Sequence, residues 1–385
     1  MKKNLFRLLL CFLVIACSDD DDSQGEIIVG GPTGIDGNDG GEVIVNDPFI
    51  YTPTASLKSV ASYPVGMIAS AQKLTNNSQT NQDFRAALNN DFNSITAEND
   101  MKMANMFSGP DTYDWSDGDA IVAYAAENGM RVHGHALIWH ESIPGWLQSF
   151  DGTDEEFQAQ IEGYVKATVA HFAEAKMTVD GEEVSVVSGW DVVNEAIDGA
   201  GLRSSLFSQR MGPNYMRLAF AWAREADADV KLFYNDYNIA GQASKRNGIL
   251  NLVVKDLQDN DIAIDGVGLQ MHIQYNFPSS GEITNALNDI AATGLLVHIS
   301  ELDIKANPDN DISELTEERA ALQEDKFKEV TEQFKALPDA QKYGITVWGL
   351  RDSESWISDG GTEWPLLFDD NFNFKISHRG FAAGL

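Results

Sequence analysis

The sequence predicts an α/β protein built as a single (β/α)8, or TIM, barrel. Eight short runs rich in β-branched and apolar residues alternate with stretches of helical periodicity over residues 51–385. Eight strand–helix units are the number that such a barrel requires. The unusual polar residues also stand at the C-terminal ends of these runs, and this is the face where barrels of this class carry their active sites.

The expected strands are parallel and buried, because most of their positions are apolar rather than alternating with polar ones. They cover residues 65–69, 92–96, 132–139, 186–193, 231–234, 264–269, 295–300 and 345–350. The clearest helical stretches between them are 120–128, 155–175, 214–225 and 315–337. The alternative is an open, doubly wound sheet, which is disfavoured because no Gly-x-Gly-x-x-Gly turn follows the first run.

The N-terminus is typical of an exported lipoprotein. Residues 1–7 carry three basic side chains, and residues 8–16 form an apolar stretch too short to span a bilayer. The sequence Val14-Ile15-Ala16-Cys17 is similar to a lipobox, in which the cysteine is acylated. We therefore expect a signal peptide over residues 1–16 and a lipid on Cys17. A plain secretory signal with an incidental cysteine is the alternative.

Residues 17–50 have the composition of a disordered acidic tether. Four aspartates, Asp19–Asp22, follow Ser18, and the remainder is mostly Gly, Asp, Asn and Pro. Like charges repel and little apolar surface can be buried, so the segment should stay extended. A calcium loop at residues 36–40 is disfavoured because the closing glutamate is missing.

The Cys-Ser-Asp-Asp pattern also resembles the export signal of surface lipoproteins in Bacteroidetes-type bacteria. It implies a lipid-anchored protein of the cell envelope, on the outer membrane and facing the exterior.

Charge and cysteine content exclude other classes. The formal net charge of −32 argues against nucleic-acid binding, which needs a basic face, whereas a neutral polysaccharide has no such requirement. Cys11 would be removed with the signal peptide, and Cys17 would carry lipid. The mature chain could then form no internal disulfide, so its fold depends on its hydrophobic core.

Two glutamates at predicted strand ends carry most of the functional information. Glu195 and Glu301 lie about a hundred residues apart, each at the end of an apolar run. A carboxylate gains nothing from ending a buried strand unless its charge is paired or used. Ordinary salt bridges would explain either one alone. Together they suggest a retaining glycosidase with one acid/base and one nucleophile.

Seven motifs in chain order support this interpretation, each at a predicted strand end. They are FNSITAENDMK from Phe92, GHALIWH from Gly134, WDVVNEA from Trp190, LFYNDYN from Leu232, GVGLQMH from Gly266, SELD from Ser300 and WGLRDSESW from Trp348. From about residue 55 to 385 the chain resembles family 10 glycoside hydrolases, which are endo-β-1,4-xylanases. The resemblance implies a barrel that hydrolyses xylan, without a cofactor and as a monomer.

The resemblance implies that Glu195 is the acid/base and Glu301 the nucleophile. Asn194 is similar to the family residue that binds the 2-hydroxyl of the −1 sugar, a bond that strengthens in the transition state. His272 and Asp303 are similar to the pair that orients the nucleophile, the aspartate fixing the imidazole tautomer. Asp303 shares a face with Glu301 only if the strand continues that far.

Further residues are expected to bind the substrate. Charged and amide groups can clamp the paired hydroxyls of a pyranose, and tryptophan faces stack on its C–H faces. The resemblance places Glu98, Asn99 and Lys102 at the −2 and −1 subsites, His135, Trp139 and Gln270 at −1, Trp348 and Trp356 as aromatic walls, and Asn235 and Tyr237 along the aglycone side. Trp190 is expected in the core instead.

The chain departs from the family pattern at two places. Glu141-Ser142 follows Trp139-His140 where the family usually has Ser-Gln or Thr-Gln, so a glutamine contact is lost or replaced at Ser142. Met103 follows Lys102 where tryptophan is common, which indicates a change in packing. Neither change affects the two glutamates.

Other functions agree less well with these residues. His133 and His135 share a strand face, but two imidazoles fall short of a zinc site, so no metal is expected. A β-mannanase or endoglucanase could use the same two glutamates on the same barrel. The Gln270-x-His272 and Glu98-Asn99-x-x-Lys102 patterns favour xylan. A non-catalytic glycan-binding protein would not need both Glu195 and Glu301.

Overall fold

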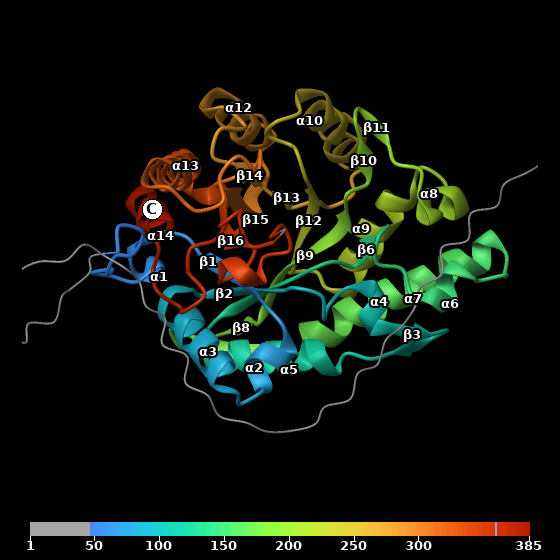
Figure 1. Ribbon diagram of the computed structural model, residues 1–385. Helices are drawn as coiled ribbons and strands as arrows, with labels where there is room; N and C mark the ends of the chain where they lie inside the picture. Colours follow the sequence, from blue (N-terminus) through green and yellow to red (C-terminus); the bar gives the residue numbers. More distant parts are fainter. Residues whose placement is uncertain (1–46, 359) are drawn as a thin grey trace, which may run out of the picture. The chain divides into compact units, whose positions relative to one another are not determined.

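A closed barrel of eight parallel strands forms the centre of the computed structural model, which describes residues 47–358 and 360–385 (Figure 1). The strands are β1 (Val65–Ala69), β2 (Ser94–Ala97), β5 (Arg131–Gly134), β9 (Val187–Asn194), β12 (Lys231–Asp236), β13 (Gly266–Leu269), β15 (Leu296–Lys305) and β16 (Lys342–Val347). Strand β16 pairs with β1, and β12 pairs with both β9 and β13, so the sheet closes on itself. The predicted barrel is confirmed, and the open sheet is excluded.

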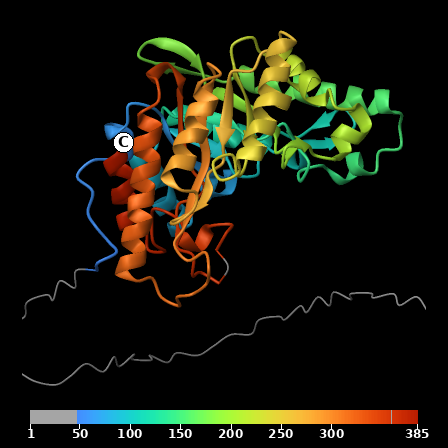
Figure 2. The ribbon, with the colours of Figure 1, turned by 90° about the horizontal axis from the view of Figure 1, so that it is seen from above.

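Helices surround the barrel (Figures 1 and 2). The larger ones are α3 (Gln79–Asp91), α5 (Ser116–Glu127), α7 (Asp154–Ala173), α9 (Tyr215–Ala226), α10 (Ala243–Ile249) with its continuations η1 (Leu250–Val254) and α11 (Lys255–Asp259), α12 (Ser280–Ala291), α13 (Glu317–Lys335) and α14 (Ile376–Gly384). Helix α7 begins at a capping box in which Thr153 and Glu156 satisfy each other's backbone amides. The four helices predicted from periodicity, seen as α5, α7, α9 and α13, are confirmed with shifts of a few residues at their ends.

Short helices and strands lie within the loops. They are α1 (Leu57–Val60), α2 (Ala71–Thr75), α4 (Met103–Met106), α6 (Gly145–Gln148), α8 (Leu206–Met211), η2 (Asp339–Gln341), η3 (Asp352–Glu354), β6 (Ile138–Trp139), β14 (His272–Gln274) and the hairpins β3 (Phe107–Gly109)–β4 (Thr112–Tyr113), β7 (Lys176–Val179)–β8 (Glu182–Ser185) and β10 (Ile197–Asp198)–β11 (Gly201–Leu202).

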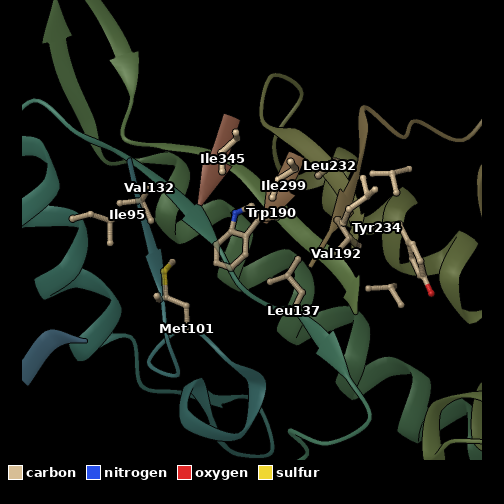
Figure 3. Packing of buried hydrophobic residues seen from close by; sticks show 14 of the residues in the cluster. Ile95, Met101, Val132, Leu137, Trp190, Val192, Leu232, Tyr234, Ile299 and Ile345 are labelled. Atoms are coloured by element: carbon tan, nitrogen blue, oxygen red, sulfur yellow. The ribbon is translucent and has the colours of Figure 1, made fainter. Parts of the chain in front are cut away.

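Trp190 belongs to the hydrophobic core, as predicted. Its side chain is 1 % exposed, and its ring centroid lies 5.7 Å from that of Phe172 on α7. Figure 3 shows the indole among buried side chains of neighbouring strands. Burying a side chain of this size contributes a large apolar area, so Trp190 fixes helix α7 against the barrel rather than binding sugar.

Two strands differ from the expectation in ways that affect the site. The run predicted at 132–139 is two strands, because β5 ends at Gly134 and the chain rejoins β9 only at β6. Strand β15 continues to Lys305, so Asp303 does lie on the same strand and face as Glu301.

The described chain begins at Asp47, and its first residues already contact the globular part. Ile50 pairs with Lys375, and the amide of Ile376 donates to the carbonyl of Phe49 at 2.8 Å. Residues 47–50, which we assigned to the tether, are therefore attached to the barrel. The signal peptide, Cys17 and the rest of the tether lie outside the described residues. Within residues 47–358 and 360–385, no helix is long and apolar enough to cross a membrane.

Candidate active site

A cleft of about 530 Å³ opens at the C-terminal ends of the barrel strands. Both glutamates singled out from the sequence face it. It is lined by Glu98, Asn99, Lys102, His135, Trp139, His140, Glu141, Asn194, Glu195, Arg203, Tyr237, Asn238, Gln270, His272, Glu301, Trp348 and Trp356. These residues follow seven different barrel strands, so tertiary folding alone brings them together.

Glu301 is buried on β15 and held from two sides. Asn235 Nδ2 donates to Glu301 Oε1 at 2.6 Å, and His272 Nε2 lies 3.2 Å from Oε2. Burial by itself would raise the pKa of this carboxyl. The hydrogen bond from His272 and the positive charge of its ring outweigh burial and lower the pKa below its ordinary value. Glu301 is therefore ionised and aimed into the cleft.

His272 bridges two carboxylates. Its Nδ1 lies 2.8 Å from Asp303 Oδ2, opposite the contact of Nε2 with Glu301. Burial would lower the pKa of this imidazole, but Asp303 and Glu301 raise it to about 10. His272 is thus a cation that keeps Glu301 charged, and Asp303 holds the opposite side of the ring.

Glu195 occupies a different environment at the end of β9. It is only partly buried, and Gln270 Nε2 donates to its Oε1 at 3.0 Å. Its backbone has φ of +57°, the left-handed region that non-glycine residues rarely adopt. Such strain is concentrated at functional sites, where the surrounding structure imposes it.

Asn235 links Glu301 to the side chain of Asn194. It is fully buried on β12, where it contacts Glu301 and also lies 3.1 Å from the Asn194 side chain beside Glu195. Ser300 Oγ donates to its Oδ1 at 2.6 Å. A Cβ at Gly268 would lie 2.3 Å from the same Oδ1, so β13 needs glycine to admit this side chain.

Comparisons with known proteins agree with this geometry. The model of glycosyl hydrolase family 10 matches residues 55–383. The endo-β-1,4-xylanase Xyn10C of Cellvibrio japonicus is 38 % identical over 351 residues, covering 84 % of this chain and 56 % of the relative. The chain belongs to glycosyl hydrolase family 10.

Solved structures of family 10 enzymes share the fold. Native xylanase 10C from Cellvibrio japonicus has a TM-score of 0.79 at 36 % identity, covering 87 % of this chain and 74 % of that one. Native xylanase 10B from Thermotoga maritima has a TM-score of 0.77 at 31 % identity, covering 85 % and 97 %. The chain spans only about half the length of the first two curated relatives, at 56 % of each.

The residues expected on the glycone side of the family 10 cleft lie together. Lys102 Nζ donates to Asn99 Oδ1 at 3.0 Å and stands 4.9 Å from the centre of the Trp139 ring. Burial lowers the pKa of Lys102, although Glu301, Glu98 and Glu195 oppose this shift. The pair of Lys102 and Trp139 offers a pyranose both a hydrogen-bond donor and a stacking face.

The two aromatic walls have unequal surroundings. Trp348 is 8 % exposed, and its ring packs edge-on against His135 with 5.4 Å between centroids. Trp356 is 63 % exposed, and its ring lies 4.8 Å from His272. Its Nε1 donates to Asp303 Oδ2 at 2.9 Å. Trp356 therefore contacts Asp303 and His272, which hold Glu301, as well as the cleft.

One predicted substrate contact is wrong. Asn235 does not line the cleft, because its fully buried side chain is hydrogen-bonded to Glu301, Asn194 and Ser300. Tyr237, two residues later, does line it, and Arg203 Nη2 donates to its hydroxyl at 2.8 Å.

Sequence reasoning missed four lining residues, although a local signal existed for three of them. They are Arg203, His140, Glu141 and Asn238. His140 ends the quoted GHALIWH motif, Glu141 follows it, and Asn238 ends the LFYNDYN motif. Arg203 reaches the cleft directly after the β10–β11 hairpin, and nothing in its local sequence indicates this.

The departures from the family pattern have structural explanations. Ser142 is buried and accepts from the amide of Ala104 at 3.3 Å, so it does not replace a cleft contact, while Glu141 faces the cleft beside His140. Met103 is fully buried at the start of α4, which agrees with a change in packing. Among the described residues, no group of three or more His, Cys, Asp or Glu could hold a metal ion.

Proposed function

We propose that the chain is an endo-β-1,4-xylanase that hydrolyses xylan with retention of anomeric configuration. The observation that carries this proposal is the contrast between two glutamates in one cleft. Glu301 is buried and bonded to a cationic imidazole, whereas Glu195 is partly exposed and bonded to neutral amides. Two carboxyls with opposite environments suit opposite roles in one reaction. The family and the printed names of its relatives support xylan as substrate.

In the first step Glu301 attacks the anomeric carbon of the −1 sugar. Glu195 gives its proton to the leaving glycosidic oxygen, and a covalent glycosyl-enzyme forms. The bond neutralises Glu301, so Glu195 can hold a negative charge and remove a proton from water in the second step. The water then releases the sugar with its original configuration. This cycle needs the two carboxyls about 5–5.5 Å apart.

The surrounding residues position the sugar. Asn194 lies beside Glu195, where it would bond the 2-hydroxyl of the −1 unit as charge develops on the ring. Glu98, Asn99 and Lys102 bind hydroxyls of the −2 and −1 units. His135, Trp139, Gln270, Trp348 and Trp356 enclose the −1 sugar, and Tyr237 faces the leaving side.

Two variants test the roles of the glutamates. Glu301→Ala should lose several powers of ten in rate, about 7 kcal/mol of barrier, with the fold intact by circular dichroism. Glu195→Ala should still release an acidic phenol from an aryl xylobioside in a burst, accumulate the glycosyl-enzyme, and be rescued by azide. Glu195 has another role if the rates on xylan and on activated aryl substrates decrease equally, with no burst and no rescue by azide.

Substrate choice is tested separately. Digestion of pure xylan, mannan and β-glucan should release oligosaccharides only from xylan. A β-mannanase would release oligosaccharides from mannan instead, and an endoglucanase from β-glucan. A surface glycan-binding protein would degrade none of the three polysaccharides. Products that first appear as the anomer of the substrate establish retention.

We also propose that lipid on Cys17 holds the enzyme, as a monomer, on the outer face of the outer membrane. The support is the lipobox-like sequence before Cys17 and the aspartates Asp19–Asp22 after it. More than one acyl chain is needed for stable anchoring, and a charged tether would let the cleft reach insoluble xylan. Cys17→Ser should leave the membrane fraction while retaining activity on soluble xylan. A Cys17→Ser protein that stays membrane-bound refutes the anchor.

A further inference from the structure

Beneath the cleft lies a buried chain of polar side chains that the proposed reaction does not use. His133 on β5 is 1 % exposed and has an oxygen near each ring nitrogen, a hydroxyl at hydrogen-bond distance from Nδ1 and a carboxylate oxygen at ion-pair distance from Nε2. Its Nδ1 lies 3.1 Å from the hydroxyl of Tyr343, and its Nε2 lies 3.0 Å from Asp191 Oδ1. The other oxygen of Asp191 lies 2.9 Å from His135 Nδ1. His135 in turn faces the cleft.

The hydrogen-bond partners determine where the protons are. Ser188 Oγ donates its single proton to the carbonyl of Val132 at 3.2 Å, so it can only accept from Tyr343, whose hydroxyl lies 2.9 Å away. Tyr343 thereby uses its own proton and can only accept from His133 Nδ1. Since Nε2 faces a carboxylate oxygen, both ring nitrogens of His133 need a proton.

The packing around His133 supports a charged ring. A Cβ at Gly189 would lie 2.5 Å from the Tyr343 hydroxyl and 3.1 Å from His133 Nδ1, so glycine makes room for this contact. Burial would lower the pKa of His133, but Asp191 and Tyr343 raise it to about 9. Burial would raise the pKa of Asp191, but the charge of His133 and the hydrogen bonds from His133 and His135 hold it below its ordinary range.

The other titratable groups around the ring are accounted for. His298 on β15, with 4.7 Å between ring centroids, bonds Thr346 through Nε2, and burial and the His133 charge lower its pKa well below the ordinary value. The guanidinium carbon of Arg131 lies over the Tyr343 ring, 3.9 Å from its centroid. One of the two neighbouring imidazoles is therefore charged and the other neutral.

We infer that His133 is a positioning residue whose buried positive charge balances Asp191 and so keeps His135 neutral, with its proton on Nδ1 and the lone pair of Nε2 turned to the −1 sugar. Without that charge, Asp191 would draw a second proton onto His135. Nε2 would then become a donor, and it could no longer accept a hydrogen bond from a sugar hydroxyl. The role in sugar binding rests on the proposed function, whereas the charge state does not.

Nitrogen-15 NMR of the resting chain tests the charge directly. The chain has seven histidines, few enough to assign individually by single substitutions with ring-labelled histidine. At pH 7 His133 should be doubly protonated, losing a proton only as the pH rises through about 9, while His135 and His298 each carry one proton. A singly protonated His133 at pH 7 overturns the inference, whatever the enzyme's substrate proves to be.

Variants test the consequence for His135. In His133→Gln, which retains polar atoms without charge, His135 should gain a second proton at pH 7, and kcat/KM for an aryl xylobioside should fall on the order of tenfold. His298→Gln is the matched control: it removes a neutral ring from the same cluster and should leave the protonation of His135 unchanged. If His133→Gln does not fold, Asp191→Asn should release the extra proton of His133 at pH 7. A singly protonated His135 in His133→Gln, or a still-charged His133 in Asp191→Asn, refutes the inference.

Discussion

Replacing Trp356 with phenylalanine should weaken the hydrogen bond from His272 to Glu301, because Trp356 acts on His272 through Asp303. The substitution keeps an aromatic face over the cleft but removes the Nε1 donor that lies 2.9 Å from Asp303 Oδ2. The same oxygen lies 2.8 Å from His272 Nδ1. Because Asp303 is fully buried, water cannot easily replace the lost indole donor. Asp303 would then attract the Nδ1 proton of His272 more strongly, and His272 would donate less to Glu301.

The size and sign of the effect follow from these contacts. A hydrogen bond to a charged group contributes about 1.5–3 kcal/mol, and because Trp356 is 63 % exposed we take the lower end, roughly tenfold in kcat/KM. Burial favours the neutral form of Glu301, and His272 reverses that preference to lower its pKa. The nucleophile acts only when ionised, so activity is lost as the pH falls through this pKa. Weakening the His272 bond raises the pKa and moves the acid limb to higher pH.

The assay is the pH profile of kcat/KM for an aryl xylobioside, in wild type and Trp356→Phe. Trp115→Phe is the control, since it removes an indole donor to Thr168 at 3.3 Å in a different part of the barrel and should leave the profile unchanged. A uniform loss of activity with an unmoved acid limb would mean that Trp356 acts by stacking alone, and the reasoning about Asp303 would be wrong.

Three further substitutions test the supports of the site. Asn235→Leu should lower kcat/KM by about ten- to a hundredfold, because Glu301 loses a charge-assisted hydrogen bond. An unchanged kcat/KM in steady-state kinetics would show that this hydrogen bond does not support Glu301. Gly268→Ala should cost about 1–3 kcal/mol in urea unfolding, since its Cβ would clash with Asn235, whereas Gly281→Ala on α12, with open space around it, should cost nothing. Lys245→Met removes the buried partner 2.6 Å from Asp236 and should destabilise the fold by about 3–5 kcal/mol at neutral pH. Burial raises the pKa of Asp236 to about 6, so the stability of wild type falls as the pH rises from about 4 to about 6, where the unfolded carboxyl is ionised and the folded one is not, and then levels off. In the variant the pKa rises further, and its melting temperature should keep falling between pH 6 and 8; a parallel pH dependence would contradict this.

The sequence by itself determined the barrel, the order of its strands and the two glutamates. Each of these depends on local information: apolar runs, helical periodicity and motifs in which Glu195 and Glu301 stand at strand ends. The expectation that Asp303 shares a face with Glu301 also held, because a two-residue spacing on one continuous strand sets a common face.

Only the tertiary structure decided what surrounds those residues. Asn235 faces inward because β9, β13 and β15 close around it, and Arg203 reaches the cleft from a hairpin whose sequence carries no signal for it. For His133 the sequence only argued against a metal site, and its partners Asp191 and Tyr343 lie on strands far away in the chain. A side chain's charge depends on the groups that replace its water, and these groups are fixed only when the barrel closes.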